Sequence, residues 1–317
     1  MAFEVPKTAY SGKIKEMKLG SGDKAVTVGG ESCYPFYLFE GEMPRSPRIA
    51  MEVWDMPPQD WAPAALEPFE GVTDDPVAWA KKCIDDYGAE MICLQLISTD
   101  PNGLGRSADE ATAVVKKVAD AIDVPLIVWG TANHDEDTEV LRQVAEVCQD
   151  KDLIIGPLEE GDHKKIGAAA IGYHHTVIAS TPIDINLAKQ LNILLGNLGV
   201  ADEMIIVDPT VSCIGYGIEY CYSVMERMRM AGLTQQDEKL QFPLICNVSK
   251  EAWKTKEVHI PTAEDPTMGD AKKRGILLEA MSAMVLLLAG GDVMVMRHPE
   301  AIKLVREMIT ELTAATK

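Results

Sequence analysis

Polar side chains follow each of eight short apolar runs in the sequence, and they are the residues that could do chemistry. They are Glu52 and Asp55; Gln95, Asp100 and Asn102; Thr131 and Asn133; Glu159 and Glu160; Thr181, Asp184 and Asn186; Asp208, Thr210 and Ser212; Asn247 and Ser249; and Arg297 and His298. Amides, hydroxyls and carboxylates dominate this set, whereas basic side chains are scarce. The pattern favours hydrogen bonds to a large ligand edged with amides, or to a pterin, over the binding of a small anion.

Metal-dependent hydrolysis and a phosphorylated substrate are both disfavoured. The six histidines include no His-x-His pair at the end of the first apolar run, and His174-His175 precedes the fifth run. The pair Gly290-Gly291 comes before the eighth run, where it predicts the end of a helix rather than a phosphate-binding loop after a strand. We therefore predict no metal ligands in this chain.

Nucleophilic catalysis and iron–sulfur binding also lack a signature. No Gly-x-Ser-x-Gly sequence occurs, and Cys213 has no expected histidine base nearby. The seven cysteines form no Cys-x-x-Cys pair, so we predict that they are small core residues. Asp162-His163 lies one position away from the Asp-x-His-x-x-Gly run that supplies a cobalt ligand in some corrinoid proteins, and we interpret it as a helix start. No catalytic residue is predicted.

The elements that position these residues alternate along the chain. Eight short runs, apolar and rich in β-branched residues, are typical of parallel strands buried on both faces. They span residues 49–53, 91–97, 125–129, 153–156, 176–180, 204–207, 243–247 and 293–296. No glycine-rich phosphate turn follows the first run, which argues against an open dinucleotide-binding sheet.

Helix start signals lie between the runs. Asp75-Pro76 predicts an N-cap with proline at the first helical position, and residues 107–110 predict a capping box for a helix that ends near Ala121. Residues 181–184 predict the cap of the helix after the fifth run, and Pro299 predicts the start of the last helix. Eight strand–helix units match one (β/α)8, or TIM, barrel of about 250 residues.

The first 48 residues differ from the rest of the chain. Residues 13–19 and 24–28 flank Gly20-Ser-Gly-Asp23, which predicts a β-hairpin. Such a hairpin would either plug the bottom of the barrel or contact another subunit, and the sequence leaves both open. The predicted organisation is an N-terminal extension over residues 1–48 and a barrel over residues 49–317.

Composition narrows the range of partners. The formal net charge of −19 repels nucleic-acid phosphates and anionic lipid headgroups, so neither nucleic acid nor a membrane is an expected partner. The apolar stretch 276–289 contains Glu279 and predicts a core helix rather than a membrane span. The first residues lack the pattern of a signal peptide, so a cytoplasmic location is expected.

Three longer stretches resemble one known family. They are Thr27-Val-Gly-Gly-Glu31, Asp184-Ile-Asn-Leu-Ala-Lys-Gln-Leu-Asn-Ile-Leu-Leu195 and Asp208-Pro-Thr-Val-Ser-Cys-Ile-Gly-Tyr-Gly-Ile-Glu-Tyr220. The chain resembles, over essentially its whole length, the small subunit of the corrinoid iron–sulfur protein, which is the same family as the delta subunit of acetyl-CoA decarbonylase/synthase. This resemblance implies a barrel akin to those of pterin-binding methyltransferases.

The resemblance also implies partners and a cofactor. The family pairs as a heterodimer with a large subunit that carries a [4Fe–4S] cluster and a corrinoid-binding domain, and the corrinoid (a cobalamin-type cofactor) lies between that domain and the small subunit's barrel. The cluster is therefore expected in the partner only. A methyl group would come from methyltetrahydrofolate through a separate methyltransferase. It would pass to acetyl-CoA synthase in the reductive acetyl-CoA pathway, an anaerobic route of carbon fixation.

Loop position then suggests which side chains contact the corrinoid, through its amides or through ordered water. They are Asn102, Asn133, Thr181, Asp184, Asn186, Asp208, Thr210 and Asn247. The chain's own role would be to position the cofactor and shield it, as a non-autonomous subunit of a methyl-transferring complex. Two alternatives stay open: an autonomous pterin-dependent methyltransferase on the same barrel, and a purely structural subunit that touches no cofactor.

Overall fold

A computed structural model describes residues 4–131 and 133–314, so the last three residues of the predicted barrel and the first three of the extension lie outside the described residues. Eight parallel strands make one sheet. They are β3 (Arg48–Trp54), β4 (Met91–Gln95), β5 (Leu126–Trp129), β6 (Ile154–Leu158), β7 (Thr176–Ser180), β8 (Ile205–Asp208), β9 (Ile245–Asn247) and β10 (Val293–Met296). Each coincides with a predicted apolar run.

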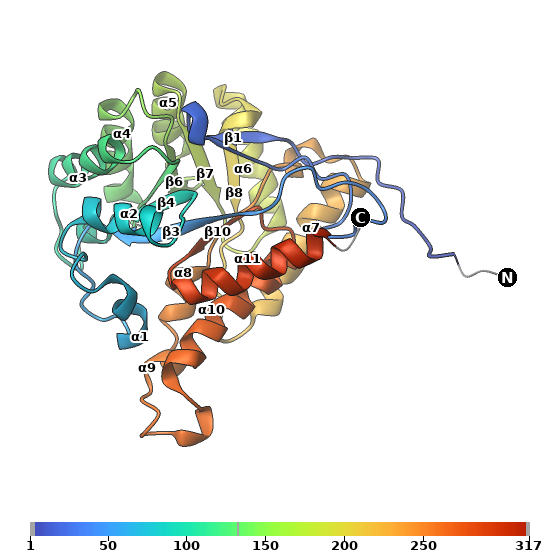
Figure 1. The fold of residues 1–317 in the computed structure, drawn as a ribbon. Helices are drawn as coiled ribbons and strands as arrows, with labels where there is room; N and C mark the ends of the chain where they lie inside the picture. Colours follow the sequence, from blue (N-terminus) through green and yellow to red (C-terminus); the bar gives the residue numbers. More distant parts are fainter. Residues whose placement is uncertain (1–3, 132, 315–317) are drawn as a thin grey trace.

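The sheet curves until its two edges meet. Its strand order is β8-β7-β6-β5-β4-β3-β10-β9, and a single parallel bridge joins Val207 of β8 to Leu244 just before β9. Val207 N donates to Pro243 O at 2.9 Å across this seam. The predicted (β/α)8 barrel is therefore confirmed (Figure 1). Its seam lies between the sixth and seventh barrel strands.

Helices alternate with the strands along the chain, and most of them cover the outer face of the sheet. They are α1 (Pro63–Leu66), α2 (Pro76–Asp85), α3 (Ala108–Ala121), α4 (His134–Val147), α5 (His163–Tyr173), α6 (Ile185–Leu198), α7 (Ile218–Thr234), α8 (Val248–Trp253), α9 (Lys256–His259), α10 (Ala271–Leu288) and α11 (Pro299–Ala314). Short 3-10 helices span Gly22–Lys24, Glu67–Phe69, Ile97–Thr99, Asp202–Met204, Glu238–Leu240 and Pro266–Met268. The outward strand residues and the inner helix faces share one apolar core.

Most of the predicted helix starts are confirmed. Asp75 caps α2, its carboxylate accepting from Val77 N at 2.9 Å. Ser107 and Glu110 form both halves of a capping box on α3, which ends at Ala121 as predicted. These caps depend on residues within one turn of each other, so the local sequence suffices to specify them.

The start of α6 differs from the prediction in detail. Asp184 alone caps this helix, accepting from Asn186 N at 2.7 Å and Leu187 N at 3.0 Å. Ile183 has a φ of 51°, in the left-handed region, so the backbone from Thr181 to Asp184 forms a turn and not the first turn of the helix.

The N-terminal hairpin lies at the amino ends of the barrel strands. It consists of β1 (Met17–Leu19) and β2 (Val26–Val28), paired antiparallel. The apolar side chains of both strands belong to the same core cluster as the inward-facing barrel residues. The hairpin therefore plugs the bottom of the barrel, which is one of the two roles that the sequence left open. Figure 1 shows it at one end of the barrel, with α1 and α9 at the other.

The cysteines and α10 behave as core elements. All seven cysteines are unbridged, and all except the partly exposed Cys213 are buried. Glu279 of α10 is completely buried. Within the described ranges, no helix has both the length and the apolar character that a membrane crossing requires.

Candidate functional site

The barrel interior changes from apolar to polar at its carboxyl end. Inward-facing residues alternate along each strand, and Ala50, Cys93, Ile178, Ile206, Ile245 and Val295 all face inward. Two positions further along the same strands stand Glu52, Gln95, Ser180, Asp208, Asn247 and Arg297, none of them more than 5% exposed. Trp129 of β5 completes this layer. The floor of the barrel mouth is thus a ring of buried polar side chains, where TIM-barrel active sites lie.

One half of this ring is an ion pair. Arg297 Nε donates to Glu52 Oε2 at 2.7 Å, and Trp54 Nε1 donates to Glu52 Oε1 at 2.9 Å. The Arg297 guanidinium also lies 3.6 Å from the ring centroid of Trp61. Glu52 and Arg297 therefore neutralise each other's charge at this side of the mouth.

Glu279 holds the backbone that carries Arg297. Its carboxylate accepts from Trp253 Nε1 at 2.8 Å, from His298 N at 3.0 Å and from Arg297 N. Complete burial raises the pKa of Glu279 to about 7, although these donors oppose the shift. The glutamate predicted only as a core residue therefore anchors the loop after β10.

The other half of the ring is centred on Asp208. Its Oδ2 accepts from Ser180 Oγ at 2.8 Å and its Oδ1 accepts from Thr210 N at 2.9 Å. Burial raises the pKa of Asp208 to about 6, with Glu251 adding to the shift and the two hydrogen bonds and Lys250 opposing it. A carboxylate oxygen can accept more than one hydrogen bond, so both oxygens of Asp208 keep room for a ligand donor.

Asp208 should make stability depend on pH. Its folded-state pKa of about 6 lies above the ordinary value of 3.8, so its contribution is fully present below about pH 4 and is lost as the pH rises through 6. We expect Asp208→Asn to gain about 2–3 kcal/mol relative to the unaltered chain between pH 4 and pH 7.5. Urea unfolding of both proteins across this range measures the difference, in which other titrations cancel. A pH-independent difference would contradict the assignment.

A cavity of about 150 Å³ opens beside Asp208. It is lined by Trp129, Pro157, Glu159, Ser180, Asp208, Thr210, Val211, Asn247, Lys250 and Glu251. Asn247 is buried in its wall, and its Oδ1 accepts from Ser249 Oγ at 3.2 Å, while its Nδ2 has no partner among the described residues. A buried amide donor without a partner is costly, and this one lines a cavity that could hold a matching acceptor.

Two neighbouring loops at the mouth carry strained backbone. Thr210 has a φ of 60° and Ile183 a φ of 51°, and both are β-branched residues in the left-handed region. The hydrogen bond from Thr210 N to Asp208 helps to hold the first of them. Such strain is found where a loop must present particular groups, here the Thr210 hydroxyl beside Ser180 Oγ at 3.3 Å.

The histidines at the mouth are engaged in packing and local contacts. His298 stacks on Trp253 with ring centroids 5.9 Å apart, and burial lowers its pKa to about 4. His134 lies between Glu159 and Asp162 at 3.4 and 3.3 Å. In the part of the chain that the structure describes, no three or more His, Cys, Asp or Glu side chains are grouped so that they could hold a metal ion.

The structure gathers three of the eight predicted contact residues around this cavity, namely Asp208, Thr210 and Asn247. Thr181 lies next to them and is buried; its backbone N donates to Asp208 O at 3.2 Å, and its hydroxyl has no partner in the part of the chain that the structure describes. Asp184 is occupied in capping α6.

The remaining three predicted residues lie apart from the cavity lining. Asn186 is exposed on α6, and Asn102 is exposed in a turn in which its backbone N donates to Asp100 at 2.8 Å. Asn133 is half-buried at the start of α4, where its side chain makes no capping hydrogen bond.

Sequence reasoning missed Ser180, Trp129 and Lys250 as parts of the site, and it did not pair Glu52 with Arg297. A signal for Ser180 was present. Two-residue periodicity within a strand whose ends are known identifies its last inward position, and that rule would have selected Ser180, Glu52 and Gln95. The side chain of Gln95 is completely buried, and neither amide atom has a partner within residues 4–131 and 133–314, but it is not part of the cavity wall.

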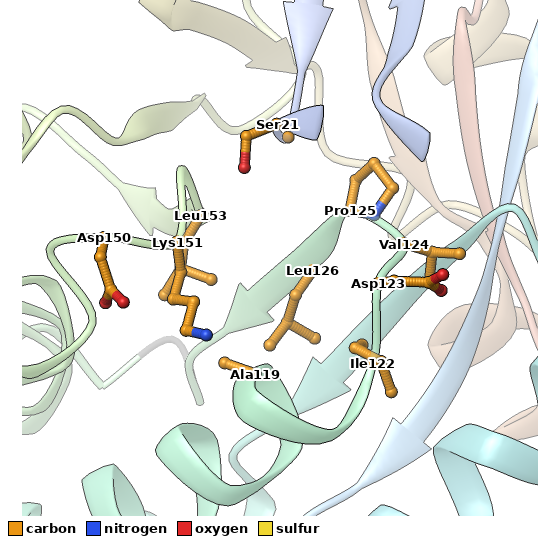
Figure 2. Close-up of a pocket in the computed structure, with 11 residues that line it drawn as sticks. Ser21, Ala119, Ile122, Asp123, Val124, Pro125, Leu126, Asp150, Lys151 and Leu153 are labelled. Carbon is orange, nitrogen blue, oxygen red and sulfur yellow. The ribbon is translucent and has the colours of Figure 1, made fainter. Parts of the chain in front are cut away.

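A second cavity, of about 200 Å³, lies at the opposite end of the barrel (Figure 2). Ser21 at the tip of the hairpin faces Pro125 and Leu126 at the start of β5, and Lys151 and Asp150 close the other side. Lys151 is paired with Asp120 at 2.8 Å. None of the unpartnered buried polar atoms found among the described residues belongs to this lining, so we treat it as a packing gap under the hairpin.

Comparison with known proteins decides the family. The family model described as CO dehydrogenase/acetyl-CoA synthase delta subunit matches residues 16–315. This chain belongs to that family. The resemblance drawn from residues 27–31, 184–195 and 208–220 is thereby confirmed.

Individual members of the delta-subunit family are also similar to this chain in sequence. The acetyl-CoA decarbonylase/synthase complex subunit delta of Archaeoglobus fulgidus is 37% identical over 98% of this chain and 71% of that relative. Subunit delta 1 from Methanosarcina thermophila is 36% identical over 92% of this chain and 67% of its own length. The relatives are thus longer than this chain, which covers about two thirds to three quarters of them.

Solved structures support the fold alone. The 7,8-dihydropteroate synthase from Vibrio fischeri aligns with a TM-score of 0.59 at 14% identity, covering 95% of this chain and 99% of that chain. Dihydropteroate synthase from Xanthomonas albilineans with 4-aminobenzoic acid aligns with a TM-score of 0.58 at 13% identity, covering 86% and 94%. The family shares its barrel with these enzymes.

Proposed function

We propose that this chain is the small subunit of a corrinoid iron–sulfur methyl carrier, and that its barrel mouth binds and shields one edge of the corrinoid. Membership of the delta-subunit family supports a role in an acetyl-CoA decarbonylase/synthase complex, since the relatives are named as subunits of that complex. A large corrinoid- and iron–sulfur-binding subunit, a methyltetrahydrofolate methyltransferase and acetyl-CoA synthase are the partners that this proposal requires.

The observation that carries the proposal is the amide nitrogen of Asn247, which lies in the cavity beside Asp208 without a partner among the described residues. The side chains around it combine a buried carboxylate, hydroxyls and an aromatic wall, which suits a large ligand edged with amides. On the other side of the ring, Glu52 and Arg297 pair with each other. The residues present fit the polar edge of a corrin.

Within this proposal the chain binds and excludes water, and the cofactor does the chemistry. The bound corrinoid supplies a cobalt centre that accepts and donates a methyl group. Asp208 and Asn247 would hydrogen-bond its polar rim, and Thr210 is held beside them by its bond to Asp208. Trp129 and Pro157 would form the apolar wall that keeps water from that edge.

An exposed apolar stripe on α10 supports a protein partner. Leu277, Met281 and Leu288 are 48%, 61% and 38% exposed and recur at helical spacing on one face. Exposed apolar side chains on one helix face are typical of a surface that another chain covers.

Co-expression tests the proposal directly. The chain and its proposed large subunit, purified together from cells grown with cobalamin, should show the visible absorption of a bound corrinoid. We expect Asn247→Ala to lower the corrinoid retained per pair severalfold, because the mouth loses its amide donor. The matched control is Asn197→Ala, which removes an exposed asparagine near the far end of α6.

Two results would redirect the interpretation. A pair whose corrin absorption ignores every substitution at the mouth points to a purely structural subunit. Methyl transfer from methyltetrahydrofolate to free cobalamin by this chain alone points to a pterin-dependent methyltransferase.

A further inference from the structure

The cavity at the ends of β7, β8 and β9 presents an acceptor and a donor from two adjacent strands. Asp208 stands on β8 and Asn247 on β9, at the seam where Val207 bridges to Leu244. Both side chains face inward and line the same cavity. Each is oriented by a neighbour in the fold, Asp208 by Ser180 Oγ and Asn247 by Ser249 Oγ.

These neighbours give the two side chains opposite roles toward a ligand. Ser249 Oγ occupies Asn247 Oδ1, so the group left for a ligand is the Nδ2 donor. The carboxylate of Asp208 receives two internal donors and is left as an acceptor. A matching ligand would therefore place an N–H group at Asp208 and a C=O group at Asn247.

An amide is a neutral group that carries both an N–H and a C=O. An ester keeps the carbonyl but lacks the N–H, and a carboxylate would face the acidic side chains of Asp208, Glu159 and Glu251 in the same wall. A site built to bind an N–H discriminates strongly against an analogue that lacks it, because its buried acceptor is left without a partner.

We propose that this cavity is an amide clamp, in which Asp208 accepts from the ligand's N–H and Asn247 Nδ2 donates to its carbonyl oxygen. The inference rests on the proposed function and names the part of the cofactor that this chain recognises: one primary carboxamide arm on the corrin rim. The ring amide of a pterin shares this chemistry and is separated from it by the experiment.

The test compares two corrins that differ only at their rims and ends. Dicyanocobinamide carries primary carboxamides, whereas the dicyano form of cobyrinic acid heptamethyl ester carries methyl esters. Equilibrium dialysis of the full chain against each gives two dissociation constants. We expect the amide corrin to bind at least about tenfold more tightly, since a hydrogen bond to a charged acceptor is lost with the ester.

Substitutions assign the discrimination to its residue. Asp208→Ala should bring the ratio of the two constants close to one, because only the N–H contact distinguishes the ligands. Asn247→Ala should weaken both corrins by a similar severalfold factor and preserve the ratio, because both offer a carbonyl oxygen. Asn197→Ala should change neither constant. If Asp208→Ala does not fold, the ratio of the two dissociation constants in the unaltered chain and the effect of Asn247→Ala still test the proposal.

Each remaining outcome has one meaning. Equal binding of both corrins, with binding of methyltetrahydrofolate that Asp208→Ala weakens about tenfold, assigns the clamp to a ring amide. Equal binding without that pterin effect, or binding of neither corrin, overturns the clamp. The proposed function is tested apart from it, because corrinoid retained by the pair and lowered by mouth substitutions would stand even if the two corrins bound equally.

Discussion

Replacing Glu52 with alanine should lower the free energy of unfolding by about 3–5 kcal/mol. Glu52 is completely buried, and its two oxygens hold Arg297 Nε at 2.7 Å and Trp54 Nε1 at 2.9 Å. Alanine would leave the Arg297 guanidinium inside the barrel without a carboxylate. An unpaired buried charge costs more than the intact pair contributes, so the loss should exceed that of an ordinary cavity-forming substitution.

Urea unfolding monitored by circular dichroism measures this loss. Adding Arg297→Met to Glu52→Ala should recover a substantial part of it, because the stranded charge is then removed and the volume kept. The matched control is Glu139→Ala, which breaks the exposed pair with Arg142 at 2.8 Å and should change stability little. A Glu52→Ala loss below about 1 kcal/mol would show that solvent reaches Arg297.

The second large effect is expected at the opposite end of the barrel. Arg229 of α7 is buried and donates to Phe242 O at 2.9 Å and, through Nε, to Gly290 O at 3.0 Å, and it forms an ion pair with Asp292. Arg229→Ala would leave the Asp292 carboxylate and two carbonyl groups with fewer donors. We expect a loss of about 3–5 kcal/mol in unfolding free energy.

Arg227→Ala is the matched control for Arg229, since it removes an exposed arginine from the same helix. Thermal and urea unfolding of the two variants should differ by most of the predicted loss. Similar stability of the two would mean that the buried arginine contributes no more than a solvated one. Gly290 shows how tightly this site is packed, because a Cβ there would lie 2.6 Å from Arg229 Cγ, and the glycine has a φ of +107°.

The secondary structure could be predicted because its causes are local. A buried strand needs a short apolar run, and the capping box of α3 needs only Ser107 and Glu110, which are three residues apart. The start of α6 was predicted less accurately, because its cause is not local. Asp184 rather than Thr181 caps that helix, and the left-handed turn at Ile183 lies between loops packed at the mouth.

The site was harder to predict, because ranking residues by loop position does not say which way they point. Asn186 and Asp208 both follow a strand end in the sequence, yet Asn186 is exposed on a helix and Asp208 is buried in the mouth. Strand periodicity would have separated the inward Ser180 and Gln95 from the solvent-facing asparagines. Periodicity alone does not show which of the inward polar groups lack hydrogen-bond partners.

By itself, the sequence determined the barrel class, the hairpin, most of the helix caps and the family, because these follow from patterns within a few residues or from long similar stretches. Only the tertiary structure decided that Glu52 pairs with Arg297, 245 positions away, and that Asp208 and Asn247 share a cavity. The physical reason is the closure of the barrel. The bridge between β8 and β9 and the pairing of β10 with β3 bring distant strand ends together, and burial then fixes which polar groups satisfy one another.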